Sequence, residues 1–231
     1  MSAIGQKLAV VSLGMSCQSA WQIDLNVNVI ELVSGDSVAK SRLPIDWLIC
    51  SPDSVGQMLR SDVFFPPSRE QFTVSPRPCW EERDVYFWHE FKRRQSGLAR
   101  LLGNRFDIKG GYESVRQKYR YLAEKFRALK ELERLVFVIS NTQNNLTDVQ
   151  KETGIIEYVL DLDEVARLCD ECDRYFERRC EYLFVTYDER VRGHSDRNNL
   201  AIFKLEPDET EWVGDQAQWN LLLSEYFHRT R

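Results

Sequence analysis

Histidine is scarce in this chain, and several other features are missing altogether. The 231 residues include three histidines, and no apolar run approaches the roughly 18 to 20 residues that span a bilayer. Acidic residues outnumber basic ones, 36 against 31, so the formal net charge of -5 creates no global attraction to nucleic acid or anionic lipid. Residues 1–7 lack the charged, apolar and cleavage regions of a signal peptide. We therefore expect a cytoplasmic protein with no nucleic-acid partner and no membrane partner.

What the chain does have is ample material for a buried core. Hydrophobic residues make up 43% of it and aromatic residues 12%, which excludes general disorder. The length suits one large domain, so we predict a single α/β domain over residues 1–231. The six cysteines are scattered through this domain, and in a reducing compartment we expect them to be free thiols. Composition gives no indication of oligomeric state.

Short apolar runs alternate with segments of helical periodicity. Runs rich in β-branched residues predict strands at 8–13, 84–91, 135–139, 182–186 and 200–204. Apolar residues spaced three and four apart predict helices that begin near 16 and 51 and others at 112–132, 161–179 and 217–227. Residues 26–43 are mixed, and a Pro-rich stretch around 62–82 is interpreted as a surface excursion. The alternation predicts a mainly parallel central sheet flanked by helices, in a doubly wound arrangement.

Cys17 lies where an open α/β sheet gathers its functional residues. The segment from Gly14 to Cys17 follows the first predicted strand, and such sites form beyond the carboxyl ends of strands. Ser16 is a candidate N-cap for the next helix, which places Cys17 near a helix N-terminus. An ordinary thiol is only about 3% ionised at pH 7, whereas a helix N-terminus and an imidazolium lower its pKa by roughly two units. A nucleophilic Cys17 therefore requires a histidine.

Only three histidines are available to serve it. His228 is close to the end of the chain, and His194 belongs to a polar loop with no orienting pattern. His89 lies among aromatic residues in the strand predicted at 84–91, where partial burial would hold its ring. We pair His89 with Cys17.

Three sequence blocks, in order, carry a resemblance to a known family. They read Ser12-Leu13-Gly14-Met15-Ser16-Cys17-Gln18-Ser19-Ala20, Pro44-Ile45-Asp46-Trp47-Leu48 and His89-Glu90-Phe91. This pattern resembles the S-L-G-x-x-C-x-x-A, P-F-D-W and H-D-F blocks of a bacterial family classed as papain-like cysteine peptidases. Ile45 replaces the phenylalanine of the second block, and Glu90 replaces the aspartate of the third. The resemblance covers the first 90 residues and, weakly, the segment 212–219.

The resemblance implies a nucleophilic Cys17, His89 as its base and Asp46 as the residue that orients the imidazole. The expected activity is that of a hydrolase or acyltransferase on an amide, ester or thioester bond of a small-molecule, glycan or peptide substrate, with no cofactor and no metal. Asn141, after the strand at 135–139, is an alternative partner for the histidine. Backbone amides at the helix start could hold an oxyanion, each worth ~3 to 4 kcal/mol. We therefore assign substrate or oxyanion contacts to Gly14, Ser16, Gln18 and Trp88.

Each of these residues also has a structural interpretation. A free cysteine is often buried, so Cys17 could simply pack the first helix onto the sheet. His89 could be a core histidine, and Asp46 could cap the turn before Trp47. Cys169 and Cys172 have metal-like spacing, but they fall inside a predicted helix without a second pair, which argues against zinc. The basic face of the helix at 112–132 is interpreted as a solvated surface.

Two other functions remain open. Gly14-Met15-Ser16 resembles the G-D-S block of SGNH-type serine esterases, with Ser16 as nucleophile, although Met15 replaces the aspartate and no D-x-x-H follows near the C-terminus. The second alternative is a non-catalytic module in which Trp80, Tyr86 and Trp88 line a groove for a carbohydrate or a peptide. Ligand binding that survives the loss of Cys17 and His89 would favour this module.

Overall fold

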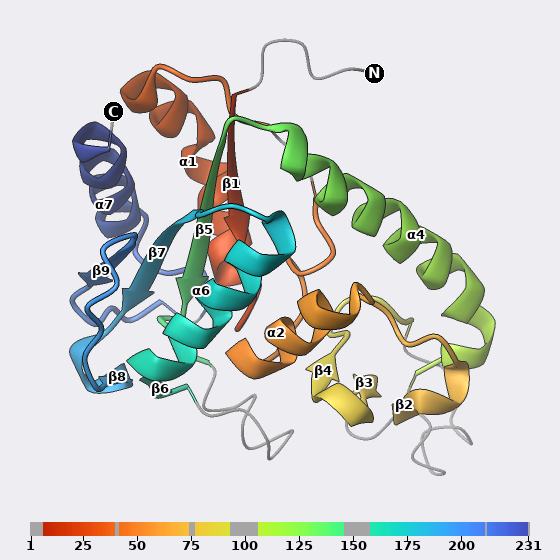
Figure 1. Ribbon diagram of the computed structural model, residues 1–231. Helices are drawn as coiled ribbons and strands as arrows, with labels where there is room; N and C mark the ends of the chain where they lie inside the picture. The colour runs from red at the N-terminus through yellow and green to blue at the C-terminus, as the bar shows by residue number, and fades with distance from the viewer. Residues whose placement is uncertain are drawn as a thin grey trace.

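The centre of the fold is a parallel sheet of four strands (Figure 1). The computed structural model describes residues 7–39, 42–73, 77–92, 106–145, 158–210 and 212–230. The strands, in spatial order, are β1 (Leu8–Ser12), β5 (Arg134–Ser140), β7 (Glu181–Thr186) and β9 (Leu200–Lys204). Their apolar residues point to both faces of the sheet, as expected for strands that are covered on both sides. The predicted parallel sheet is confirmed.

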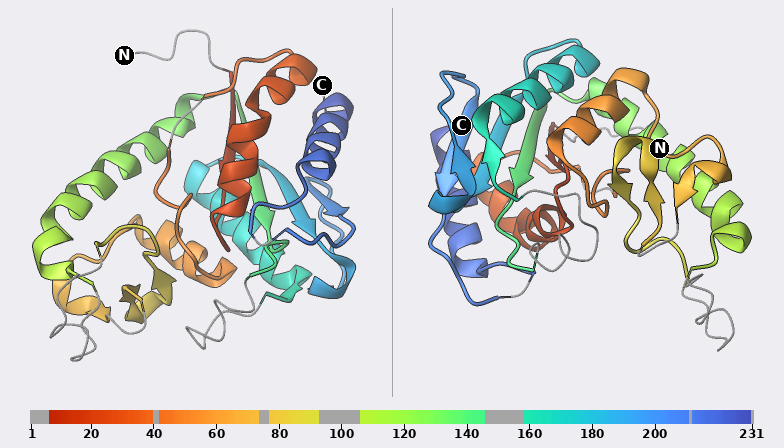
Figure 2. Two further views of the ribbon diagram at one scale, coloured as in Figure 1. Left: turned by 180° about the vertical axis from the view of Figure 1, so that it is seen from behind. Right: turned by 90° about the horizontal axis from the view of Figure 1, so that it is seen from below.

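Helices cover both faces of this sheet. Helices α1 (Gln18–Ser34) and α7 (Gln216–Arg229) lie side by side on one face (Figure 2, left). On the other side lie α2 (Pro52–Ser61), α4 (Ile108–Ala128) and α6 (Leu162–Phe176), with α2 packed against α6. Asp107, Asp161 and Asp215 cap α4, α6 and α7 by accepting hydrogen bonds from first-turn amides. The α/β class is confirmed.

A smaller antiparallel sheet lies apart from the main one, beneath α4 (Figures 1 and 2). It consists of β2 (Phe72–Thr73), β3 (Cys79–Trp80) and β4 (Val85–Tyr86). Phe65 and Phe72, from the predicted Pro-rich excursion, pack against the ring of Tyr112 of α4, Phe65 tilted and Phe72 edge to face. The excursion is therefore anchored by aromatic packing. Two further strands, β6 (Leu160–Asp161) and β8 (Val191–Arg192), pair with each other. The remaining described elements are four short 3₁₀ helices, η1 (Arg69–Gln71), η2 (Glu81–Arg83), η3 (Leu129–Glu131) and η4 (Asp188–Arg190).

Two predicted segments were wrong in detail. Helix α1 runs on to Ser34 through the stretch that the sequence left mixed, because buried polar residues blur its periodicity. Gln22, for example, is buried and donates to the Val213 carbonyl at 2.6 Å. The strand predicted at 84–91 ends at Tyr86, because β4 pairs with β3 through only two residues. His89 therefore lies in a turn.

No helix in the described part of the chain combines the length and the apolar character that crossing a bilayer requires.

Candidate active site

The turn between β1 and α1 places Cys17 at the start of a long helix. Gly14 has a φ of 88° and Met15 has a φ of 66°, both in the left-handed region, so the backbone reverses sharply after the strand. Cys17 is the N-cap of α1, one residue later than the predicted Ser16. Ser16 is buried instead, and its hydroxyl accepts the Gln18 amide at 3.3 Å. The turn thus holds the thiol at the carboxyl end of the sheet, as predicted.

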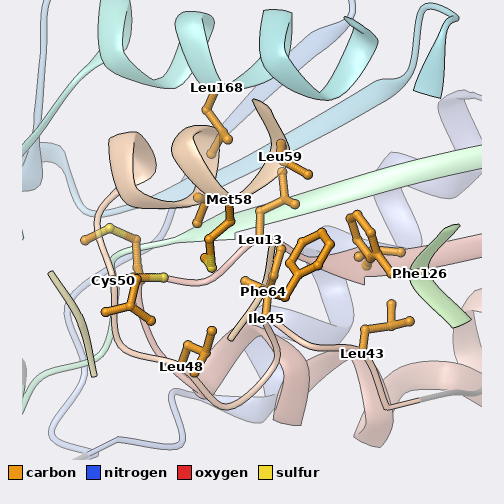
Figure 3. Packing of buried hydrophobic residues seen from close by; sticks show 14 of the residues in the cluster. Leu13, Leu43, Ile45, Leu48, Cys50, Met58, Leu59, Phe64, Phe126 and Leu168 are labelled. Carbon is orange, nitrogen blue, oxygen red and sulfur yellow. The ribbon is translucent and has the colours of Figure 1, made fainter. Parts of the chain in front are cut away.

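The segment 43–50 packs directly against this turn (Figure 3). A Cβ on Gly14 would lie 3.0 Å from Cys50 Sγ and 3.2 Å from Ile45 Cγ2, so the approach is close enough to need glycine. Asp46, from the same segment, is buried and accepts the Leu43 amide at 2.7 Å through Oδ2. This hydrogen bond closes the tight turn at 44–47 and fixes the position of the next residue, Trp47.

The small sheet brings His89 to the same place. Ile49 and Tyr86 exchange backbone hydrogen bonds at 3.1 and 2.9 Å, which ties the segment 43–50 to β4. The turn that follows β4 then presents Trp88 and His89. The rings of His89 and Trp47 meet edge to face, with centroids 5.6 Å apart at an angle of 89°. Trp47 is thus the described residue whose ring contact positions the imidazole.

The loop after β5 forms another side of the site. The Arg190 guanidinium donates to the carbonyls of Asn141 and Gln143 at 2.9 and 3.1 Å. The Asn141 side chain donates to the carbonyls of Tyr158 and Arg190, so it braces the loop, and it is not among the residues that line the pocket with His89. Asn144 donates to the carbonyl of Thr210 at 2.6 Å. These bonds make the loop rigid where it carries Gln143.

These four segments and the loop before α7 enclose one small pocket of about 160 Å³. Its walls combine a thiol, an imidazole, indoles and carboxamides; the lining residues are Cys17, Trp47, Ile49, Trp88, His89, Gln143, Asn145 and Trp212. The structure therefore brings together three of the predicted site residues, Cys17, His89 and Trp88. No other described residue with a charged side chain joins them. Sequence reasoning missed Gln143 and Asn145, although a polar run directly after a buried strand was a signal for them.

The other predicted residues surround the pocket without lining it. Gly14 and Ser16 shape the turn. Gln18 is buried behind the pocket, where its Oε1 accepts the hydroxyls of Ser140 and Thr142 at 3.3 and 2.6 Å. Asp46 makes its hydrogen bond to Leu43, and in the described part of the chain no hydrogen bond links it to His89. Asp46 as the orienting carboxylate stays a prediction.

Burial acts on both reactive groups and leaves both of them neutral. It raises the pKa of the Cys17 thiol to about 11, and the hydrogen bond from its own backbone amide lowers the pKa only in part. Partial burial lowers the pKa of His89 from its ordinary value, while Glu90 nearby raises it less. At pH 7 the thiol keeps its proton and the imidazole is unprotonated. The arrangement offers a proton donor and a base, and the thiolate is not preformed.

Residues proposed for other functions lie elsewhere. Trp80 and Tyr86 are 1% and 2% exposed, so neither lines a groove with Trp88. Cys169 and Cys172 belong to α6, and both are buried in the apolar core. Within the described ranges, no three histidine, cysteine or acidic side chains are grouped so that they could hold a metal ion. Comparison with models of protein families, with curated proteins and with solved structures found no match.

Proposed function

We propose that this protein is a cysteine-nucleophile hydrolase or acyltransferase that acts on an amide, ester or thioester bond. The observation that supports the proposal is the pocket shared by Cys17 and His89 at the carboxyl end of the parallel sheet. The resemblance of three sequence blocks to papain-like cysteine peptidases points the same way, and two of those blocks supply the thiol and the imidazole.

The chemistry follows from the neutral state of the pair. Neutral His89 accepts the proton of the Cys17 thiol while sulfur attacks the carbonyl carbon, and the imidazolium then protonates the leaving nitrogen or oxygen. Water or another acceptor attacks the resulting acyl thioester, and His89 again takes the proton. The helix α1 has no acidic residue in its first turn, so its dipole favours negative charge at Cys17 and on the oxyanion.

The geometry also weighs against the alternatives. Ser16 is buried and its oxygen accepts a backbone amide, so the thiol is the nucleophile that faces the pocket. Two of the three aromatic residues proposed to line a binding groove, Trp80 and Tyr86, are buried in the core, so they could not contact a ligand there. An enzyme that uses Cys17 accounts for the polar groups around the pocket more fully than either.

Acyl-enzyme trapping tests the proposal. With p-nitrophenyl acetate, we expect a burst of p-nitrophenolate and, by peptide mass spectrometry, one acetyl group on Cys17. Cys17→Ala removes both signals, whereas Cys180→Ala, which makes the same change at a buried cysteine away from the pocket, preserves them. Hydrolysis that continues at the same rate in Cys17→Ala contradicts the proposal.

A further inference from the structure

Gln143 lines the pocket, and its side chain carries a buried polar atom that is unpaired among the described residues. Gln143 is 4% exposed, and its Nε2 is hydrogen-bonded to Asn145 Oδ1. Its Oε1 is buried, and among the described residues this oxygen accepts no hydrogen bond. A buried acceptor without a partner costs about 1 to 3 kcal/mol, so such groups are rare and need an explanation. A donor on a ligand would satisfy it, because Gln143 lines the pocket together with Cys17.

The size and the walls of the pocket restrict that ligand further. At about 160 Å³ the pocket is smaller than the roughly 300 to 1,000 Å³ that encloses a whole small molecule, so it accommodates a group the size of one side chain. The indoles of Trp47, Trp88 and Trp212 supply flat apolar walls. Neither an arginine nor a lysine is among the residues that line it, and the Arg77 guanidinium lies over the ring of Trp88, 3.8 Å from its centroid.

We infer that Gln143 is a specificity-determining residue whose Oε1 accepts an N–H from the substrate, so that the pocket selects carboxamides over esters. This inference rests on the proposed function, because it takes Cys17 as the reacting group. An amide N–H beside the scissile carbonyl pairs with the free oxygen. An ester presents only oxygen there and leaves Gln143 unpaired, and sites built to bind a substrate N–H discriminate strongly against such analogues.

The reaction that follows is balanced without a cofactor. The Cys17 sulfur bonds to the carboxamide carbon, the carbon–nitrogen bond breaks, and the thiol proton leaves on the nitrogen as ammonia or an amine. Water then divides the thioester into a carboxylic acid and the regenerated thiol. No electron donor or acceptor is required.

Alkylation of Cys17 by matched reagents tests the selectivity separately from turnover. Iodoacetamide and methyl iodoacetate alkylate a thiol by the same displacement of iodide, but only iodoacetamide carries an N–H. Rates at Cys17 are measured by peptide mass spectrometry and divided by the rates with glutathione. We expect the amide-to-ester ratio at Cys17 to exceed that of glutathione by about tenfold or more, as one satisfied buried acceptor predicts.

Two variants assign the selectivity to Gln143. Gln143→Leu and Gln143→Met should both bring the ratio to within about twofold of the glutathione value, since neither offers a strong acceptor. Gln117→Leu makes the same change on the exposed face of α4 and should leave it unchanged. A wild-type ratio equal to that of glutathione, or a preference for the ester, overturns the inference. Selective labelling without any acyl-enzyme overturns the proposed function and leaves Gln143 as the selector of ligands.

Discussion

Cys17 and His89 carry the proposed chemistry in the form that a buried pair favours. With a pKa of about 11, only about one Cys17 thiol in ten thousand is ionised at pH 7. In the proposed reaction the thiol therefore depends on His89 to accept its proton at the moment of attack. The imidazole in turn contacts the ring of Trp47 edge to face, and this contact involves no charged group. This pair differs from the thiolate–imidazolium pair that the position of Cys17 alone suggested.

The pH dependence of kcat/KM reports on His89. Its folded pKa lies below the ordinary value, so the base form is present at neutral pH and is lost as the pH falls through that folded pKa. We expect kcat/KM for p-nitrophenyl acetate to fall on the acid side, with a midpoint below the ordinary histidine pKa of about 6.5. His89→Gln should lower kcat/KM by about 10²- to 10⁴-fold and abolish this acid limb. His228→Gln, at an exposed position of α7, is the control. If the acid limb of the kcat/KM profile is unchanged in His89→Gln, His89 is not the base.

At the scale of elements, the site depends on one tight turn. The turn between β1 and α1 needs a left-handed residue at Gly14 and tolerates one at Met15 only because the side chain of Met15 is buried there. Cys50 and Ile45 lie close to Gly14, so the turn and the segment 43–50 can approach each other this closely only because residue 14 has no Cβ.

Gly14→Ala should therefore destabilise the protein by about 1 to 3 kcal/mol, because alanine is strained at this φ and its Cβ collides with Cys50 Sγ. Urea unfolding measures the change. The matched control is Gly56→Ala, inside α2, where the new Cβ meets only ordinary contacts at 3.4 Å. There we expect a gain of about 0.5 to 1 kcal/mol from helix propensity. Equal effects at both glycines would refute the steric account of the turn.

Sequence reasoning succeeded for elements whose pattern is local. The strand at 135–139 and the helix at 112–132 were predicted from periodicity, and both are present as β5 and α4. It failed where pairing partners are distant: the stretch around His89 has strand composition, but β3 offers a partner to only two residues. The site shows the same division. Cys17 was found by its position after a strand, whereas Trp212 reaches the pocket from a loop near the other end of the chain, where the only sequence signal was the weak resemblance over 212–219.

At the scale of the whole molecule, Asp46 links stability to pH. Burial raises its pKa to about 7; Asp24 raises it further, and Arg42, Lys125 and the Leu43 amide lower it. Because the folded state holds this proton more tightly than the unfolded state, its contribution is greatest below the unfolded pKa of about 4. It is lost as the pH rises to about 7, by at most about 4 kcal/mol. A carboxylate paired with an imidazolium would show the opposite trend.

Asp46→Asn keeps an acceptor for the Leu43 amide and removes the titration. Because a raised folded pKa makes wild type less stable as the pH rises, the free energy of unfolding of this variant in urea should increase relative to that of wild type between pH 5 and pH 8. Asp53→Asn, on the exposed start of α2, should show no such change. If the variant instead loses stability relative to wild type as the pH rises over this interval, Asp46 is a stabilised anion and its role as a partner of His89 gains support.

The first strand of the sheet has its neighbours far away along the chain. Leu8 pairs with Arg134, and the apolar side of α1, with Ile23 and Val27, is covered by α7. On the ribosome, a nascent chain therefore exposes the β1–α1 unit until the C-terminal helix has emerged. Cys17 is therefore assembled into its pocket late in biogenesis, and a chain truncated before α7 exposes an apolar surface that chaperones and proteases recognise.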